Sequence, residues 1–437
     1  LTFLLIESLD MKKNRYQTYI NVDDGYYLHY NAFSNKYILL DEKKHSIYQN
    51  CSTDEIKSVD GKLFDTLVNE CFIVENDFDE PSIVEYRKLS EKMDSSTYHI
   101  VINVTLDCNL RCWYCYENRI VGSNLQDDVL LFIQKNIRTH YKSAPYSTLK
   151  ISFFGGEPFM NSRAIKQTLS SAKEFCNECG ITLIADFTTN ATLIRQSDIS
   201  FLQDYLCFFQ ITLDGNQENH NRIKQIKGKN AYELTLNNIH RLSRNLSDCR
   251  IWVRINYDAQ TLTKISDILD SLMNIDKNRT FLILRKVWQT NPITIPRELL
   301  LTAIQKIISA GFFVDCYALS RNSVCLAERT NPVLINFDGK IFKCSTISAF
   351  DEQHSMGKIN YDTGKIEWDI NKIAKIPLVL KNEKCQKCEL YPACFGPCNK
   401  NLLKPGKRNC ILDEMNMTMR DYIMYNFKLS LLYETFD

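Results

Sequence analysis

The stretch HIVINVTLDCNLRCWYCYEN, residues 99–118, decides the fold. Its first eight residues form an apolar run that predicts a buried strand. Three cysteines follow at once with the spacing CxxxCxxC: Cys108, Cys112 and Cys115. In parallel α/β barrels the reactive groups lie on loops at the carboxyl ends of the strands, and this is the first such loop. The stretch therefore predicts both a parallel sheet and the position of its site.

Five further apolar segments continue the strand pattern, at residues 149–156, 181–189, 207–215, 251–258 and 280–287. Stretches with helical periodicity separate them, at residues 127–141, 164–176, 198–206, 232–245 and 265–275. Strands that alternate with helices form parallel sheets through right-handed crossovers. Because six such units are fewer than the eight of a closed barrel, the sequence predicts the α/β class with a partial (β/α)6 TIM-type barrel.

Length and composition limit the class of protein. A chain of 437 residues with 44% hydrophobic and 24% charged residues is a folded protein of two or three domains. Lys and Arg number 53 against 52 for Asp and Glu, so no excess of positive charge favours nucleic acid as a partner. No apolar run approaches the length of about 20 residues that a membrane span needs. We therefore expect no nucleic-acid partner and no membrane partner.

The 17 cysteines are unusual for a chain too long to need disulfides. The opening residues 1–6 are apolar but lack the basic region and cleavage site of a secretory signal. We therefore expect a cytoplasmic, reducing location, where clustered cysteines indicate metal or redox sites rather than disulfides.

Regions with other sequence patterns flank the predicted barrel. Residues 26–31 and 36–41 predict a hairpin, residues 62–74 a helix with Leu63, Leu67 and Cys71 on one face, and residues 77–81 a linker. From residue 315 onward we expect loops until a closing helix near residues 414–433. The expected domains are an N-terminal small α+β domain (1–95), the barrel (96–310), a loop-rich iron-sulfur domain (311–412) and a C-terminal helix (413–437).

The cysteine triad indicates an iron-sulfur cluster with an open position. Three thiolates can hold three irons of a four-iron cluster and leave the fourth iron free for another ligand. A structural zinc site normally has four ligands, and no fourth Cys or His lies in this loop. The motif resembles that of the radical SAM enzymes, with Tyr114 in the aromatic position. The resemblance implies that S-adenosylmethionine binds the open iron, that its reductive cleavage yields a 5′-deoxyadenosyl radical, and that Tyr114 contacts the adenine.

Polar residues follow the later strands in order. Paired glycines after the second strand, in FFGGEP, let backbone approach a ligand closely and resemble the GGEP motif of the same family. A period of two places Arg254 and Asn256 on one face of the fifth strand. The resemblance implies that these strand ends bind S-adenosylmethionine, although a tight turn and buried polar ladders are open alternatives. The implied cofactor-binding residues are Tyr114, Gly155, Gly156, Glu157, Thr189, Asn190, Gln210 and Arg254.

The C-terminal region has a second cysteine array. Its spacing resembles that of the SPASM domain, which holds two auxiliary four-iron clusters in radical SAM enzymes that modify peptides and proteins. The matching cysteines are Cys325, Cys344, Cys385, Cys388, Cys394, Cys398 and Cys410. The resemblance assigns Cys385, Cys388, Cys394 and Cys410 to one cluster. It assigns Cys325, Cys344 and Cys398 to the other, with Cys316 as a candidate fourth ligand. A zinc ribbon is the alternative interpretation.

The resemblance implies that the protein holds three [4Fe–4S] clusters: one radical SAM cluster and two auxiliary clusters. The N-terminal region looks like a PqqD-like domain, which would bind the leader of a precursor peptide by adding it as a strand to a sheet edge; a cap on the barrel is the alternative. Sulfatase-maturing enzymes place an Asp directly after the cysteine that corresponds to Cys344, whereas this chain has Ser345.

We therefore expect a radical SAM/SPASM maturase that crosslinks a ribosomally synthesised peptide through a thioether or carbon–carbon bond. A flavodoxin or ferredoxin would supply electrons, and the sequence identifies no catalytic base. One alternative is an enzyme of the anaerobic sulfatase-maturing type. The other is a non-catalytic iron-sulfur or zinc scaffold, against which the open iron of the triad argues.

Overall fold

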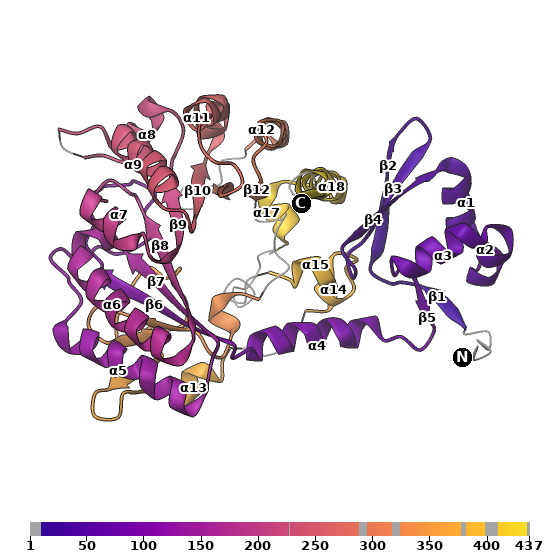
Figure 1. Ribbon diagram of the computed structural model, residues 1–437. Coiled ribbons are helices and arrows are strands. Elements are labelled where there is room, and N and C mark those ends of the chain that lie inside the picture. The colour runs from indigo at the N-terminus through magenta and orange to yellow at the C-terminus, as the bar shows by residue number, and fades with distance from the viewer. Residues whose placement is uncertain are drawn as a thin grey trace. The chain divides into compact units, whose positions relative to one another are not determined.

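The computed structural model describes residues 10–226, 228–287, 295–316, 324–376, 382–397 and 410–434 (Figure 1). The chain divides into two compact units. The N-terminal unit comprises Leu1–Lys92, Ala318–Val324 and Leu378–Lys428. The barrel unit comprises Met93–Tyr317, Cys325–Pro377 and Leu429–Asp437. The predicted region 311–412 is thus shared between both units.

The barrel unit contains an 11-stranded sheet in the order β12-β11-β10-β9-β8-β7-β6-β13-β14-β15-β16. All six predicted strands are confirmed, and neighbouring strands among them pair in parallel. They are β6 (Thr97–Thr105), β7 (Thr148–Gly155), β8 (Thr182–Thr189), β9 (Leu206–Thr212), β10 (Cys249–Tyr257) and β11 (Thr280–Lys286). Alternate side chains are completely buried on one face of the sheet, where the rings of Phe153, Phe187 and Phe209 stack across neighbouring strands at centroid distances of 5.3 and 4.7 Å.

Helices connect these strands and cover the outer face of the sheet (Figure 1). The five predicted helices are α5 (Asp127–Ser143), α6 (Ser162–Cys179), α7 (Gln196–Leu202), α9 (Ala231–Asn245) and α11 (Ile265–Ser271). The structure adds α8 (Gln217–Ile223), α10 (Ala259–Thr263), α12 (Arg297–Ser309) and the 3₁₀ turn η1 (Pro158–Asn161). Their apolar faces pack on the sheet. Because the strands are parallel, the loops that follow them lie together at the carboxyl ends of the strands.

Short strands extend the sheet beyond the six predicted ones. β12 (Val314–Cys316) pairs in parallel with β11, and β13 (Val333–Ile335) pairs in parallel with β6. An antiparallel meander then adds β14 (Lys340–Phe342), β15 (Gly357–Asn360) and β16 (Lys365–Trp368). The expectation of loops here was wrong because strands of three or four residues are too short to show an alternating pattern.

The N-terminal unit contains two small sheets. β1 (Met11–Lys13) pairs with β5 (Ile73–Glu75), and β2 (Gln17–Asp23), β3 (Tyr26–Asn31) and β4 (Lys36–Asp41) form an antiparallel sheet that includes the predicted hairpin. Its first three helices are α1 (Glu42–Asn50), α2 (Thr53–Val59) and α3 (Gly61–Asn69). Their core includes Tyr48, Ile56, Leu67 and Phe72, all with at most 1% of their surface exposed.

Two predictions for this region need correction. The predicted helix 62–74 ends at Asn69, because Cys71 has a left-handed backbone (φ 62°) and the residues after it enter β5. The predicted linker 77–81 is shorter, because helix α4 (Glu80–Met93) already begins at Glu80. Leu63 and Leu67 are buried on one face of α3 as expected, but Cys71 lies beyond that helix.

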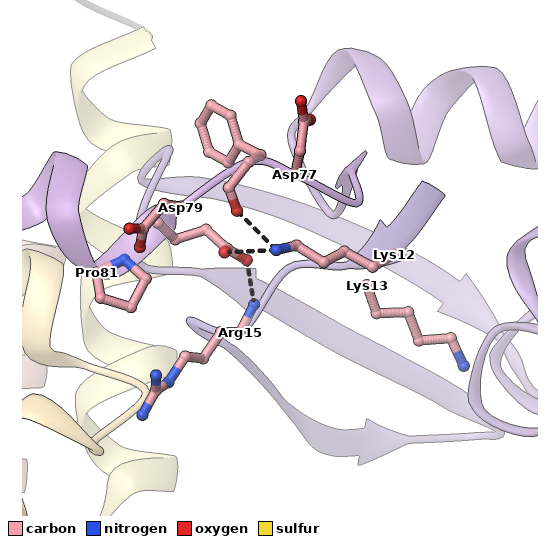
Figure 2. A pocket seen from close by; sticks show the side chains of 8 residues that line it. Lys12, Lys13, Arg15, Asp77, Asp79 and Pro81 are labelled. Carbon is pink, nitrogen blue, oxygen red and sulfur yellow. Dashed lines mark hydrogen bonds and ion pairs between the residues drawn. The ribbon is translucent and has the colours of Figure 1, made fainter. Parts of the chain in front are cut away.

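The buried carboxylate of Glu80 fixes the start of α4 to the N-terminal unit. A cavity of about 340 Å³ lies beside it and is lined in part by Lys12 and Arg15, which Figure 2 labels. Lys12 Nζ lies 3.2 Å from Glu80 Oε2, and the backbone N–H of Arg15 donates to Glu80 Oε1 at 3.1 Å. Lys12 also donates to the carbonyl of Phe78 at 2.6 Å. The charge of Glu80 is therefore neutralised and hydrogen-bonded where it is buried.

The remaining elements are short until the end of the chain. They are η2 (Leu326–Glu328), α13 (Ile370–Ile373), α14 (Glu383–Gln386), α15 (Tyr391–Cys394) and α17 (Ile411–Met415). The predicted closing helix is α18 (Met419–Glu434); it starts later than expected, after Asn416 in a left-handed conformation (φ 52°). Among the residues that the structure describes, no helix is long and apolar enough to cross a membrane.

Candidate active site

A cavity of about 170 Å³ lies at the carboxyl ends of the parallel strands. Loops after β6, β7 and β8 and side chains of β9 and β10 form its wall, and Asn256 and Thr188 also line it. Most of the predicted site residues meet here: Cys108, Cys112, Tyr114, Cys115, Gly155, Gly156, Thr189, Asn190, Gln210 and Arg254. Residues from distant parts of the sequence thus share one cavity, as the strand order predicts.

Asp107 closes the loop that carries the cysteine triad. Its carboxylate accepts hydrogen bonds from the backbone N–H groups of Cys108 at 2.7 Å and Gly122 at 2.8 Å. Arg119 adds an ion pair at 2.5 Å to the same carboxylate. Since these contacts join both ends of the loop, the backbone between them is held in one conformation. Neither Asp107 nor Arg119 was among the site residues predicted from the sequence.

The three thiols of the triad share the wall of this cavity. The N–H of Leu110 points at Cys108 Sγ (3.4 Å), and Lys224 Nζ lies 3.8 Å from Cys112 Sγ. Burial raises the pKa of Cys108 to about 12 and also raises the pKa of Cys115, so as free thiols both are protonated. Metal coordination reverses this, because a coordinating thiol is deprotonated outright. Three cysteines around one cavity, with N–H and ammonium donors to the sulfurs, fit a four-iron cluster with one open iron.

Gly155 and Gly156 are required by close backbone packing. Gly155 has a φ of 110°, and a Cβ there would lie 2.0 Å from the carbonyl oxygen of Thr105. A Cβ on Gly156 would lie 2.0 Å from the carbonyl oxygen of Asp107. The glycines therefore let the end of β7 approach the start of the cysteine loop, where the N–H of Gly156 donates to Thr105 at 3.0 Å. The sequence predicted that these glycines let backbone approach a ligand closely. In the structure, the close approach is to the backbone of Thr105 and Asp107.

Glu157 supports the site from behind the cavity wall. It is fully buried and accepts hydrogen bonds from Thr189 Oγ1 (2.7 Å), the N–H of Asn190 (2.8 Å) and the N–H of Phe159 (3.0 Å). Burial raises the pKa of Glu157. Its carboxylate therefore fixes the end of β8, which presents Thr189 and Asn190 to the cavity.

A polar network surrounds Tyr114. The Tyr114 hydroxyl donates a hydrogen bond to Asp214 and accepts one from Asn256 Nδ2 (3.1 Å). Asn256 in turn accepts from Arg254 Nε (2.9 Å), while Val253 and Ile255, which alternate with them along β10, are completely buried. The period-two pattern of β10 therefore points Arg254 and Asn256 toward the cavity, as predicted.

Three charged residues in the cavity were missed by the sequence analysis: Lys224, Glu117 and Lys286. Burial raises the pKa of Glu117 to about 7. Burial opposes the charge of Lys224, but Cys112, Tyr114 and Asp214 outweigh it and raise the Lys224 pKa well above its usual value. In the sequence, KQIKGK around Lys224 has the composition of an exposed polar segment. Only the folded loops show that this lysine is enclosed.

The segment that follows Cys344 lies against the triad loop. The Tyr116 hydroxyl donates to the carbonyl of Ser345 (3.4 Å), and the N–H of Asn118 donates to the carbonyl of Ser348 (2.9 Å). Cys344 is half-buried and Cys325 is exposed, and both belong to the barrel unit. Cys344 is therefore joined through this short segment to the wall of the candidate active site.

Four described cysteines of the array, Cys385, Cys388, Cys394 and Cys410, lie in the N-terminal unit. Burial raises the pKa of Cys385, and Cys388 and Cys410 add to that rise, so these three thiols are electrostatic neighbours. Cys394 ends α15. Cys398 lies outside the described residues, and Cys316 is the last residue of β12. Within the described ranges, no three His, Cys, Asp or Glu side chains lie close enough together to hold a single metal ion.

Comparison with known proteins finds a matching family model and several similar enzymes. Residues 102–271 match the model of the radical SAM superfamily. A cysteine-type anaerobic sulfatase-maturating enzyme of Clostridium novyi is 22% identical, over 68% of this chain and 86% of the relative. The radical SAM cyclopropyl synthase TigE of Paramaledivibacter caminithermalis is 23% identical, over 79% of this chain and 78% of the relative.

A solved structure agrees in fold. It is native anSMEcpe with bound AdoMet and the Cp18Cys peptide, with a TM-score of 0.60 and 15% identity, covering 78% of this chain and 99% of the other. The partial barrel, the triad on its first loop and the matched superfamily model agree. Residues 102–271 therefore form a radical SAM domain, a superfamily that uses S-adenosylmethionine and a [4Fe–4S] cluster, and the chain is similar to radical SAM enzymes that modify peptides and proteins.

Proposed function

We propose that the chain is a peptide maturase that crosslinks a ribosomally synthesised precursor peptide through a thioether or carbon–carbon bond. The observation that supports this most is the cavity in which the triad, the paired glycines and the polar ends of β8, β9 and β10 meet. The relatives support a polypeptide substrate, because one is named a sulfatase-maturating enzyme and a similar fold was solved with a peptide bound.

Each group of residues has a proposed part in this reaction. Cys108, Cys112 and Cys115 hold the cluster, and Tyr114, Gly155, Gly156, Thr189, Asn190, Gln210 and Arg254 surround S-adenosylmethionine. Glu157 fixes the wall on which Thr189 and Asn190 lie. When bound, the cluster and S-adenosylmethionine together supply a 5′-deoxyadenosyl radical that abstracts hydrogen from the peptide.

Two auxiliary [4Fe–4S] clusters complete the proposal. Closing a crosslink after hydrogen abstraction requires one electron and one proton to leave the substrate, and thiolate-held clusters are suited to accept the electron. Cys385, Cys388, Cys394 and Cys410 would hold one cluster, and Cys325, Cys344 and Cys398 the other, with Cys316 as candidate fourth ligand. The grouping of Cys385 with Cys388 and Cys410 supports the first set. The contact of the Ser345 segment with Tyr116 supports a cluster near the active site.

The N-terminal domain is proposed to bind the leader of the precursor. Its antiparallel sheet of β2, β3 and β4 has edge strands to which an extended peptide can add by main-chain hydrogen bonds. A flavodoxin or ferredoxin in a reducing cytoplasm would supply the electrons.

Sulfatase maturation is the second candidate, and its support is the similarity to the Clostridium novyi enzyme. That chemistry uses an Asp directly after the cysteine that corresponds to Cys344, but this chain has Ser345. A serine cannot act as a carboxylate does in proton transfer at neutral pH. We therefore favour crosslinking of a precursor peptide.

The test is an anaerobic assay of the full-length protein with S-adenosylmethionine, a low-potential reductant and the short peptides encoded beside its gene. We expect a peptide product lighter by one hydrogen from each joined position, together with 5′-deoxyadenosine. A sulfatase-derived peptide is the parallel substrate. Conversion of that peptide alone would favour the second candidate, and 5′-deoxyadenosine formation without a change in any peptide would contradict both.

A further inference from the structure

Lys224 is a buried ammonium group beside a ligand of the proposed cluster. It follows directly after helix α8, and only 5% of its side chain is exposed. Its Nζ lies 3.8 Å from Cys112 Sγ and 3.7 Å from Asp214 Oδ2. The ammonium also lies 5.5 Å from the centre of the Tyr114 ring. One positive charge is thus held within the cavity, against a sulfur of the triad.

Asp214 is fixed by other contacts and therefore fixes Lys224. Its carboxylate is completely buried and accepts hydrogen bonds from the N–H of Asn256 (2.8 Å) and from the Tyr114 hydroxyl. Its own N–H donates to His220 Nδ1 at 3.1 Å. The two bonds to the carboxylate come from β10 and the triad loop, and the bond from the backbone N–H goes to α8. The carboxylate is therefore held in one orientation. The lysine therefore has a fixed ion-pair partner in addition to Cys112.

A charge in this position acts on the potential of a cluster. Reduction adds one electron to the cluster, and the potential depends on net charge, on hydrogen bonds to the sulfurs and on burial. A positive charge a few ångströms from a sulfur stabilises the reduced form more than the oxidised form. Burial strengthens this effect, because it removes water that would screen the charge.

We propose that Lys224 is a positioning residue whose ammonium group, held by Asp214 against Cys112 Sγ, raises the reduction potential of the triad cluster. The lysine keeps its proton throughout, and the electron comes from the low-potential reductant. The proposal rests on the assignment of Cys108, Cys112 and Cys115 as cluster ligands, but it requires neither the auxiliary clusters nor the peptide. Its consequence is that a weaker electron donor can start the reaction.

The alternative is that Lys224 only neutralises the buried charge of Asp214. An ion pair of that kind would affect folding, and any change at position 224 would then act through stability. The two interpretations differ in one quantity, the midpoint potential of a cluster in a correctly folded protein.

The experiment is an EPR-monitored redox titration of the full-length holoenzyme and four variants. Only the signal that changes on addition of S-adenosylmethionine is followed, because that change identifies the cluster with the open iron. Lys224→Met removes the charge and the donor. Lys224→Gln removes the charge but keeps an N–H donor, and Lys224→Arg keeps both. A fourth variant, Lys142→Met, removes an exposed lysine of α5 as a control for surface charge.

We expect a more negative midpoint potential for Lys224→Met and Lys224→Gln, and values close to the wild type for Lys224→Arg and Lys142→Met. Formation of 5′-deoxyadenosine by the neutral variants should fall with dithionite and recover with the stronger reductant titanium(III) citrate. If the neutral variants assemble no cluster while Lys224→Arg does, the alternative is favoured and the proposal is overturned, because neutralisation of Asp214 alone explains that result.

An unchanged potential in Lys224→Gln or Lys224→Met would overturn the proposal, and so would loss of the cluster in all three Lys224 variants. Failure of the triad assignment is distinguishable, because the variant with Cys108, Cys112 and Cys115 changed to Ala would then keep the signal that responds to S-adenosylmethionine.

Discussion

Gly155 shows how a single residue determines the site. Its φ is positive, and a Cβ at this position would lie 2.0 Å from the Thr105 oxygen, which leaves no room for any side chain. Gly180, at the end of α6, also has a positive φ (65°), but a Cβ there would meet nothing within 4 Å. Substitution of Gly180 therefore adds only the strain of a left-handed backbone, whereas substitution of Gly155 adds a steric clash as well.

Gly155→Ala should consequently destabilise the protein more than Gly180→Ala. We expect a loss of roughly 1–2 kcal/mol for Gly180→Ala, from the left-handed backbone alone. For Gly155→Ala we expect a loss above about 4 kcal/mol, because the backbone of β6 must also move. Urea unfolding of both variants measures the difference. Equal losses would mean that β6 and β7 can separate without cost.

His29 predicts a pH dependence of stability. It is 1% exposed and lies 3.0 Å from His45 Nδ1, and burial followed by repulsion from His45 lowers its pKa to about 3. The unfolded chain takes up a proton at His29 below about pH 6.5, whereas the folded chain does not. The stabilising contribution is therefore complete above pH 6.5 and is lost as the pH falls.

We expect His29→Gln to reduce the pH slope of the unfolding free energy by about 1.4 kcal/mol per pH unit below pH 6.5. Denaturant unfolding of wild type and variant at pH 7.0 and 5.5 measures this. Identical slopes would show that the folded protein protonates His29 in the same range as the unfolded chain.

At the scale of elements, helix α4 supports the segment that contains Cys385. Val84 is completely buried against Tyr16, Phe33 and Tyr391 in a cluster that includes Cys385. Glu85 accepts a hydrogen bond from the Tyr391 hydroxyl at 2.6 Å. Lys88 donates to the carbonyl of Phe395 at 2.8 Å. The N-terminal strands and α4 are thus part of the wall around one proposed auxiliary cluster.

Tyr391→Ala should therefore loosen that cluster. Removal of a buried aromatic side chain costs about 3–5 kcal/mol, and we expect iron content to fall by about four atoms per chain. Tyr86→Ala is the matched control, because Tyr86 lies on α4 but is 72% exposed. Iron and sulfide analysis after anaerobic purification compares the two. Full iron content in Tyr391→Ala would show that this wall is dispensable.

The elements also show where sequence reasoning succeeds. β6 to β11 were predicted because short runs rich in apolar, aromatic and β-branched residues identify strands. α4 was missed because three of its buried positions are charged: Glu80, Lys88 and Lys92. A hydrophobic pattern cannot identify a helix whose buried face contains paired charges. β13 to β16 were missed because each is only three or four residues long.

For the whole molecule, the residues of the site were predictable where a motif or a strand end marks them. Glu117 follows the triad by two residues and Lys286 ends β11, but Lys224 had no such mark, since its place in the cavity depends on how separate loops converge. The cysteine array was predicted as one domain, but its described members are divided between the barrel unit and the N-terminal unit. Spacing alone could not show this division, because contacts between distant segments determine it.

A double variant tests the proposed division of labour between the clusters. Cys385→Ala with Cys388→Ala should remove one auxiliary cluster, lower iron by about four atoms per chain and still allow 5′-deoxyadenosine formation. The crosslinked peptide should be absent, because the electron that leaves the substrate has no acceptor. Product mass and 5′-deoxyadenosine are measured in one anaerobic assay. Crosslinking at the wild-type rate by the folded variant would show that the electron leaves by another route.

The central claim is that the triad at the end of β6 holds the cluster that cleaves S-adenosylmethionine. The most direct measurement is 5′-deoxyadenosine formation under titanium(III) citrate by the wild type and by a variant with Cys108, Cys112 and Cys115 all changed to Ala. We expect formation by the wild type and none by the variant, with the remaining cysteine sites unaffected. Equal formation by both proteins would contradict the assignment.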